Sequence, residues 1–170
     1  NVLNQIISLC SGRLQSYGNF DFFKSIQVIT PTKKGMLGTK DLNKVLQEHL
    51  NPLSEDHLER QNLGASFRAG DRVMQIKNNY DIYWEKGAKS TAVKYETGTG
   101  IFNGELGRII KINQETKQLQ VEFDDKKVAW YTFTELDQLE QAYAITIHKA
   151  QGSEFDIVIL VVPQSSNMLL

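Results

Sequence analysis

Apolar side chains recur with a helical period at the start of the chain and with a strand-like period after residue 66. The first 18 residues predict an amphipathic helix that ends near residues 17–19. The β-branched segment at residues 25–30 (SIQVIT) predicts a short strand, which ends before Pro31 because proline cannot continue a central ladder. The apolar positions of the predicted helix are Val2, Leu3, Ile6, Ile7, Leu9, Cys10 and Leu14.

A basic, glycine-containing loop follows this strand and leads into a second predicted helix. Thr39 is the expected N-cap, and Asn51 with Pro52 is the expected stop. Strand, loop and helix together form an α/β unit, which binds ligands at the carboxyl end of its strand. Lys33 and Lys34 lie in that loop. One face of the helix is marked by Leu42, Val45, Leu46, His49 and Leu50.

Short segments of alternating polarity fill the middle of the chain and predict antiparallel strands at residues 71–77, 106–112, 119–124 and 127–133. Several such strands in so short a stretch indicate a small barrel or twisted sheet of SH3-like kind, inserted between α/β segments. Phe123, Trp130 and Phe133 are expected in its core.

Residues 82–100 lack a clear period and predict a protruding loop or hairpin. A flexible loop is the favoured interpretation, and stacking on single-stranded DNA is the alternative. The aromatic and basic residues concerned are Tyr83, Trp84, Lys86, Lys89, Lys94 and Tyr95.

Two apolar segments near the end of the chain, residues 142–147 (AYAITI) and 157–162 (IVILVV), predict buried strands of a parallel sheet, the second as a continuous apolar run. The residues between them are either a solvated turn closed by Gly152 or a ligand-binding block. Hydroxyl and lysine donors position phosphates, whereas a carboxylate suits a ribose hydroxyl, so the block can face two ligands. Its polar residues are Thr146, His148, Lys149, Gln151, Ser153 and Glu154.

Composition narrows the classes of partner. The net charge is −1, from 19 basic and 20 acidic side chains, which excludes a chain that coats nucleic acid by bulk electrostatics. The single cysteine, Cys10, excludes an internal disulfide and favours the cytoplasm. The longest apolar run is too short to span a bilayer, so no membrane partner is expected. The three histidines lie far apart and predict no metal site.

Two blocks of this sequence resemble helicase motifs. Residues 142–156 (AYAITIHKAQGSEFD) are similar to motif V of superfamily 1 helicases of the RecD and TraA kind, and residues 27–52 resemble the segment around motif IV. A TIHKxQG block also occurs in helicases similar to Pif1. The Gly-x-x-Gly-Thr run followed by Leu-Asn and Leu-Asn-Pro points to the RecD-like branch. The segments FRAGDRVMQIKNNYD, IFNGELGRI and VEFDDKKVAWYTFTEL resemble the SH3-like insertion of this family.

The resemblance implies an α/β fold, a RecA-like (P-loop NTPase-type) parallel-sheet domain interrupted by a small all-β SH3-like barrel. Residues 1–65 are the expected first part of a second RecA-like domain, and residues 66–136 are the expected insertion, with the loop at 82–100. Residues 137–170 are the expected remainder, ending before the arginine-bearing motif VI.

The resemblance further implies an ATP-dependent DNA helicase that moves 5′ to 3′ along single-stranded DNA in recombination and repair. Ala150 stands where the family commonly has serine, and alanine lacks the hydroxyl donor. The residues implied to bind DNA are Pro31, Lys33, Lys34, Thr146, His148 and Lys149. The residues implied to contact ATP are Gln151, Gly152 and Glu154.

The sequence contains no G-x-x-x-x-G-K-[ST] loop and no acidic Mg²⁺-binding motif after one. The isolated chain is therefore expected to have no complete catalytic site, with ATP and Mg²⁺ held partly by residues outside it. The other expected partners are a first RecA-like domain and repair-complex subunits. Two alternatives are a segment of a TraA-like relaxase-helicase and a module that binds DNA or protein through the SH3-like insertion.

Overall fold

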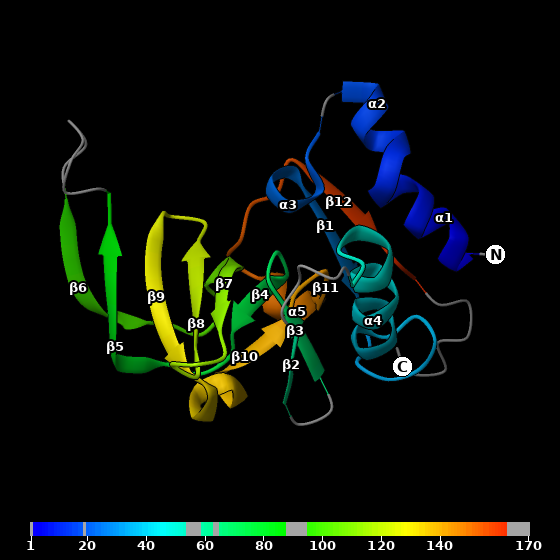
Figure 1. The fold of residues 1–170 in the computed structure, drawn as a ribbon. Coiled ribbons are helices and arrows are strands. Elements are labelled where there is room, and N and C mark those ends of the chain that lie inside the picture. The colour runs from blue at the N-terminus through cyan, green and yellow to red at the C-terminus, as the bar shows by residue number, and fades with distance from the viewer. Residues whose placement is uncertain (1, 19, 54–58, 63–64, 88–94, 163–170) are drawn as a thin grey trace. The chain divides into compact units, whose positions relative to one another are not determined.

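The computed structural model describes residues 2–18, 20–53, 59–62, 65–87 and 95–162 (Figure 1). The chain divides into two compact units. The first combines Asn1–Pro52 with Tyr143–Leu170, and the second is Leu53–Ala142. The second unit is wider than the predicted insertion at 66–136, because the strand at residues 139–141 belongs to its sheet. One stretch of chain therefore separates the two sequence segments of the first unit.

The first unit is an α/β structure, as the pattern of apolar residues predicts. Its opening helix runs as α1 (Val2–Ser8), a π-helical turn (Leu9–Arg13) and α2 (Leu14–Gly18). The remaining elements are α3 (Phe22–Ser25), β1 (Ile26–Thr30), α4 (Thr39–Leu50), β11 (Ala144–Thr146), α5 (Ile147–Ala150) and β12 (Ile157–Leu160).

A three-stranded parallel sheet forms the centre of this unit, in the order β11-β1-β12 (Figure 1). The predicted parallel pairing is confirmed, and every residue of β1 is buried. The prediction that residues 157–162 form a continuously buried run is wrong. Val158 is 48% exposed and Leu160 57% exposed, because β12 lies at the end of the described sheet with one face uncovered.

Helix α4 packs on the sheet through a face in which half of the buried side chains are amides. Its buried residues are Leu42, Asn43, Leu46 and Gln47. The prediction that His49 belongs to this face is wrong, because His49 is exposed and its ring contacts the carbonyl of Val45. The N-cap is Gly38, one residue before the predicted Thr39, whereas the predicted stop at Asn51 is the C-cap. Apolar and amide contacts together therefore fix this helix.

The core of the first unit joins the opening helix to the sheet. Burial removes the Cys10 thiol from water and raises its pKa to about 12. The buried residues of this core are Ile6, Cys10, Phe22, Ile26, Val28, Leu42, Leu46, Tyr143, Ala144 and Val161. Nowhere in the described ranges is there a helix with the length and apolar character that crossing a membrane requires.

The second unit is an antiparallel seven-stranded sheet in the order β10-β4-β7-β8-β9-β5-β6, with a separate β2-β3 hairpin. The four predicted strands are all present, and β5 and β6 add a hairpin at one end. The strands are β2 (Glu59–Asn62), β3 (Ala65–Arg68), β4 (Arg72–Gln75), β5 (Asn79–Lys86), β6 (Glu96–Ile101), β7 (Leu106–Asn113), β8 (Gln118–Phe123), β9 (Lys127–Thr132) and β10 (Leu139–Gln141).

The described parts of residues 82–100 form the two arms of a hairpin, one of the two forms that the sequence predicted. β5 pairs with β6 from Tyr83 and Thr99 to Lys86 and Glu96, so most of the segment belongs to the sheet. The interpretation as a flexible loop is wrong there, because backbone hydrogen bonds fix both arms. Lys89 and Lys94 lie outside the described residues.

Side chains of β9 alternate between the core and the outer face of the sheet. Phe123 is buried, and Phe133 packs against the core, as predicted. The prediction for Trp130 is wrong: Tyr131 occupies the core, so its neighbour faces the other way. There Trp130 stacks on Tyr83, with ring centroids 6.3 Å apart and planes at 28°.

A buried polar network ties several elements of the second unit together. The Tyr131 hydroxyl donates to Gln75 Oε1 at 2.9 Å, and Gln75 Nε2 donates to the Lys77 carbonyl at 2.9 Å and to Gln138 Oε1 at 3.2 Å. Asn79 Nδ2 donates to the same Gln138 oxygen at 2.9 Å. Burial raises the pKa of Tyr131 above its usual range, so the phenol stays neutral. The network links β9, β4, β5 and the 3₁₀ helix Phe133–Gln138.

Replacing Tyr131 with phenylalanine should destabilise the second unit. The substitution keeps the ring and leaves the buried Gln75 Oε1 without its hydroxyl donor, which costs about 1–3 kcal/mol. Urea unfolding followed by tryptophan fluorescence measures the change. Tyr80→Phe is the matched control, because Tyr80 is 66% exposed. Equal stability of the two variants would contradict the role given to the network.

Candidate functional site

The carboxyl ends of β1 and β11 lie side by side in the first unit. Their register pairs Thr30 with Thr146, so Pro31 and Ile147 leave the sheet at the same edge. Helix α5 contacts both strands. The segments that follow, residues 31–38 and 146–150, therefore begin next to each other, and together they are named the carboxyl edge below. The six predicted DNA-binding residues all belong to it.

The loop at residues 31–38 is closed by hydrogen bonds at its base. Thr30 Oγ1 donates to the Leu37 carbonyl at 2.8 Å, and the Gly38 N–H donates to the Gly35 carbonyl at 2.7 Å. The Thr39 N–H donates back to the Thr32 carbonyl at 3.0 Å. These bonds fold the loop onto the start of α4 and limit the positions that its backbone can adopt.

Glycine is required at two points of this loop. Gly35 has a φ of +87°, which side chains with a Cβ rarely adopt. At Gly38 an added Cβ would lie 2.5 Å from the Lys34 carbonyl oxygen, too close for any other residue. The tight turn leaves Lys33 and Lys34 exposed beyond Pro31, which is partly buried at the end of β1.

Thr146 closes β11 and starts the turn α5. Only 8% of the residue is exposed, and its Oγ1 accepts from the Lys149 N–H at 3.4 Å as the N-cap. A threonine hydroxyl that accepts one bond can still donate its own proton. His148 is exposed and Lys149 partly exposed on this turn, so the imidazole is open to solvent beside the loop of Lys33.

The predicted nucleotide residues come after α5 and lie farther along the connection. Gln151, Gly152 and Glu154 are all exposed, and Gly152 has a φ of +84° with open space around it. β12 then starts at Ile157, which pairs with Ile26 at the opposite end of β1. Because β1 lies between β11 and β12, this connection crosses from one end of β1 to the other. The predicted DNA-binding residues at 146–149 and the predicted nucleotide-binding residues at 151–154 therefore occupy successive parts of one segment.

Two buried amides at the start of β11 were not predicted as part of the site. Asn43 Oδ1 accepts from the Ala144 N–H at 2.7 Å, and its Nδ2 donates to the Ala144 carbonyl at 3.1 Å. Gln27 Nε2 donates to the Tyr143 carbonyl at 3.2 Å. The sequence signal was present in both, since each is a polar residue at a position where helix or strand periodicity expects an apolar one.

Positive charge gathers at the carboxyl edge without neutralising partners in the loop. Within the described ranges, Lys33 and Lys34 make no ion pair. No group of three His, Cys, Asp or Glu residues capable of holding a metal ion occurs in the part of the chain that the structure describes. The site can therefore offer cations, hydroxyls and backbone donors, which suit an anionic ligand.

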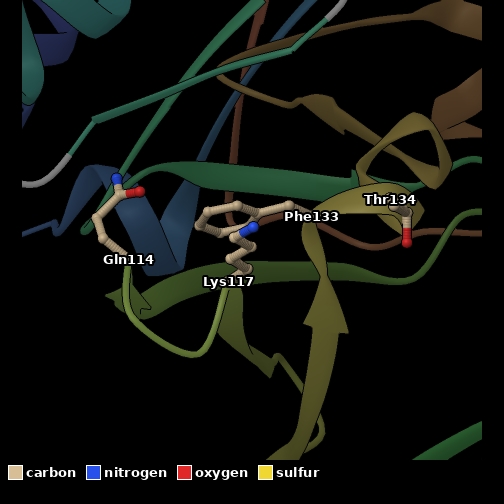
Figure 2. Close-up of a pocket in the computed structure, with 4 residues that line it drawn as sticks. All are labelled: Gln114, Lys117, Phe133 and Thr134. Atoms are coloured by element: carbon tan, nitrogen blue, oxygen red, sulfur yellow. The ribbon is translucent and has the colours of Figure 1, made fainter.

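A separate hollow of about 310 Å³ lies on the second unit (Figure 2). Figure 2 shows the Phe133 ring and the Lys117 side chain close together, with Gln114 and Thr134 on either side. The Phe133 N–H donates to the Lys117 carbonyl at 3.0 Å, which fixes this corner of the sheet. None of the predicted site residues lines the hollow.

Comparison with known proteins finds matches to two kinds of helicase domain. Residues 42–123 match the family of SH3 domains from ATP-dependent RecD-like DNA helicases. Residues 141–169 match the UvrD-like helicase C-terminal domain. The second match begins at residue 141, next to Ala142, the residue at which the second unit ends.

Relatives agree with these matches. The ATP-dependent RecD2 DNA helicase of Deinococcus radiodurans is 36% identical over 146 residues, which are 86% of this chain and 17% of that protein. The RecBCD enzyme subunit RecD of Buchnera aphidicola subsp. Schizaphis graminum is 28% identical over 87% of this chain and 22% of that protein. Over most of its length the chain is therefore similar to RecD-like DNA helicases.

The chain spans about a fifth of the length of these relatives. A crystal structure of Pif1 helicase from Bacteroides in complex with ADP-AlF3 and ssDNA is 17% identical, with a TM-score of 0.49, over 96% of this chain and 39% of that one.

Thr146→Val should loosen the turn at residues 147–150. Valine keeps the shape and burial of threonine and removes the cap acceptor, which costs about 0.5–2 kcal/mol at an N-cap. Hydrogen exchange of the Lys149 amide measures the effect and should accelerate. Thr146→Ser keeps the acceptor and is the matched control. Identical exchange in both variants would show that the cap does not hold this turn.

Proposed function

We propose that this chain supplies the single-stranded DNA grip and one side of the ATP cleft of a DNA helicase that hydrolyses ATP. The observation that carries the proposal is the pairing of Thr30 with Thr146, which joins two separately predicted basic segments into one edge. The similarity to RecD-like DNA helicases supplies the class of reaction. Because the chain spans about a fifth of its relatives, the whole reaction needs residues beyond those in this sequence.

The DNA strand runs along the carboxyl edge in this proposal. Lysines, hydroxyls and backbone N–H groups are the donors that position phosphates without reading sequence. Lys33 and Lys34 supply charge from one side, and His148 and Lys149 supply donors from the other. A local cluster of this kind binds a polyanion although the net charge of the chain is −1.

The nucleotide lies farther along the connection, next to Gln151, Gly152 and Glu154. A carboxylate repels phosphate oxygens and accepts well from ribose hydroxyls, so Glu154 suits the sugar. The open space around Gly152 admits a close approach by a phosphate group. ATP with Mg²⁺ fits these residues only in part, because the sequence has no phosphate-cradling loop. When bound, the nucleotide supplies the anhydride whose hydrolysis drives movement.

Both ligands contact one short segment, which provides a physical route for coupling. A nucleotide that favours one position of residues 151–154 changes the position of residues 146–149, and DNA does the reverse by reciprocity. We assign 5′ to 3′ movement and a role in recombination and repair on the strength of the resemblance to RecD-like helicases. A first RecA-like domain and repair-complex subunits are the partners that this role requires.

A binding module centred on the second unit is the competing function. The stacked rings of Tyr83 and Trp130 favour it, since Tyr83 is 45% exposed and offers a surface for a nucleobase. Stacking a base on an aromatic side chain contributes about 1–3 kcal/mol. The same binding assay separates the two functions if each surface is altered in turn.

Fluorescence anisotropy with a labelled oligothymidylate tests the proposal on the 170-residue chain. The double variant Lys33→Ala/Lys34→Ala should bind roughly tenfold more weakly, and the slope of log K against log salt should become shallower by about 0.7 for each lost phosphate contact. Lys24→Ala/Lys44→Ala removes the same charge, from the amino side of β1 and from the exposed side of α4, and is the matched control.

Equal losses of affinity in both double variants would show that binding follows the net charge alone, and would contradict the proposed DNA site. Loss of binding in Tyr83→Ala, together with full binding in Lys33→Ala/Lys34→Ala, would instead favour the binding module.

A further inference from the structure

Helix α4 contacts the edge of β11 through one side chain that takes the place of a neighbouring strand. In a strand, the N–H and C=O of one residue point to the same side. The Asn43 side chain accepts a hydrogen bond from the Ala144 N–H at 2.7 Å and donates one to the Ala144 carbonyl at 3.1 Å. Both groups lie on the edge of β11 that faces away from β1. Asn43 is only 8% exposed and Ala144 1% exposed, so this contact is shielded from water.

We propose that Asn43 is a positioning residue of the DNA grip, which sets the place of Thr146 and the α5 turn relative to the loop of Lys33 and Lys34. This inference rests on the proposed function. Asn43 lies in the second turn of α4, and α4 begins directly after that loop. Ala144 lies two residues before Thr146 on a three-residue strand. The contact therefore joins the two halves of the carboxyl edge through two short, stiff segments.

The chemistry of the contact selects an amide. Only asparagine or glutamine presents a donor and an acceptor side by side, and glutamine is one methylene longer. An aspartate would keep the acceptor for the Ala144 N–H and face the Ala144 carbonyl with a negative charge. A leucine of similar size would leave both backbone groups without partners. The two hydrogen bonds between Asn43 and Ala144 therefore fix the register of β11. A slip of the strand by one residue would turn its side chains to the opposite face of the sheet.

Gln27 supports the same strand from the other side. Its Nε2 donates to the Tyr143 carbonyl, one residue before the Asn43 contact, and the residue is fully buried in β1. The consecutive residues Tyr143 and Ala144, at the entry to β11, are thereby held by amides from two different elements. Gln27 acts from within the sheet, whereas Asn43 connects β11 to the helix that continues the loop.

Hydrogen exchange and oligothymidylate binding on the 170-residue chain test the proposal with Asn43→Ala and Asn43→Leu. Alanine leaves room for water at Ala144, which favours a folded variant, and leucine fills the space. Exchange at residues 144–150 should accelerate by about tenfold or more, because both hydrogen bonds to Ala144 are lost. Exchange in β12 and in the second unit should stay as in the parent chain. Lys44→Gln, an exposed neighbour on α4, is the matched control and should leave residues 144–150 unchanged.

DNA binding provides the readout that a merely structural role would not produce. Affinity should fall by a similar factor in both Asn43 variants, with an unchanged salt slope, because no cation is removed. A parent chain that does not bind the oligonucleotide would contradict the proposed function, and the exchange pattern would still test the positioning. Unaltered exchange at residues 144–150 would overturn the role of Asn43. Acceleration spread evenly over the first unit in both variants would overturn it as well, and so would loss of the unit's fold in both.

Discussion

The parallel pairing of β1 with its two neighbours is the constraint on which the rest of the first unit depends. β1 is central and wholly buried, and its carboxyl end at Thr30 is aligned with Thr146. That alignment places a basic loop and a polar turn at one edge although they lie more than a hundred residues apart in the sequence. β12 starts opposite the other end of β1, so the connection between them spreads its polar residues along the strand.

The insertion makes this arrangement costly to assemble, and the structure compensates with specific contacts. Asn43 and Ala144 are separated by 101 positions, most of them in the second unit. Closing so long a loop costs conformational entropy, although the cost grows slowly with length. The second unit has its own apolar core and its own buried network around Gln75 and Tyr131. Each unit thus has a separate apolar core, and specific contacts such as that of Asn43 hold the sheet of the first unit together.

Periodicity and motif spacing predicted most of the fold, because those signals are local. The strand at Ile26–Thr30, the helix up to Asn51 and the four central strands of the second unit all follow from patterns within a few residues. The failures concern which face a residue occupies. His49 and Trp130 carry apolar surface and yet point outward, and the apolar β12 exposes Val158 and Leu160.

Burial of this kind is decided by partners that are distant in the sequence. The same limit explains why Asn43 and Gln27 were not recognised as parts of the site. Their partners, Ala144 and Tyr143, lie beyond the insertion, and a single sequence gives no information on that pairing. The residues implied by helicase motifs came from resemblance, and the structure brings Pro31, Lys33 and Lys34 to the same edge as Thr146.

The central claim is that residues 31–38 and 146–150, the carboxyl edge, form one DNA surface. An NMR titration of the isotope-labelled chain with oligothymidylate tests it directly. The account predicts that the amide signals of both segments shift together and fit one dissociation constant, while those of β7 and β8 stay in place. Shifts confined to one of the two segments, or to the surface around Tyr83 and Trp130, would contradict it.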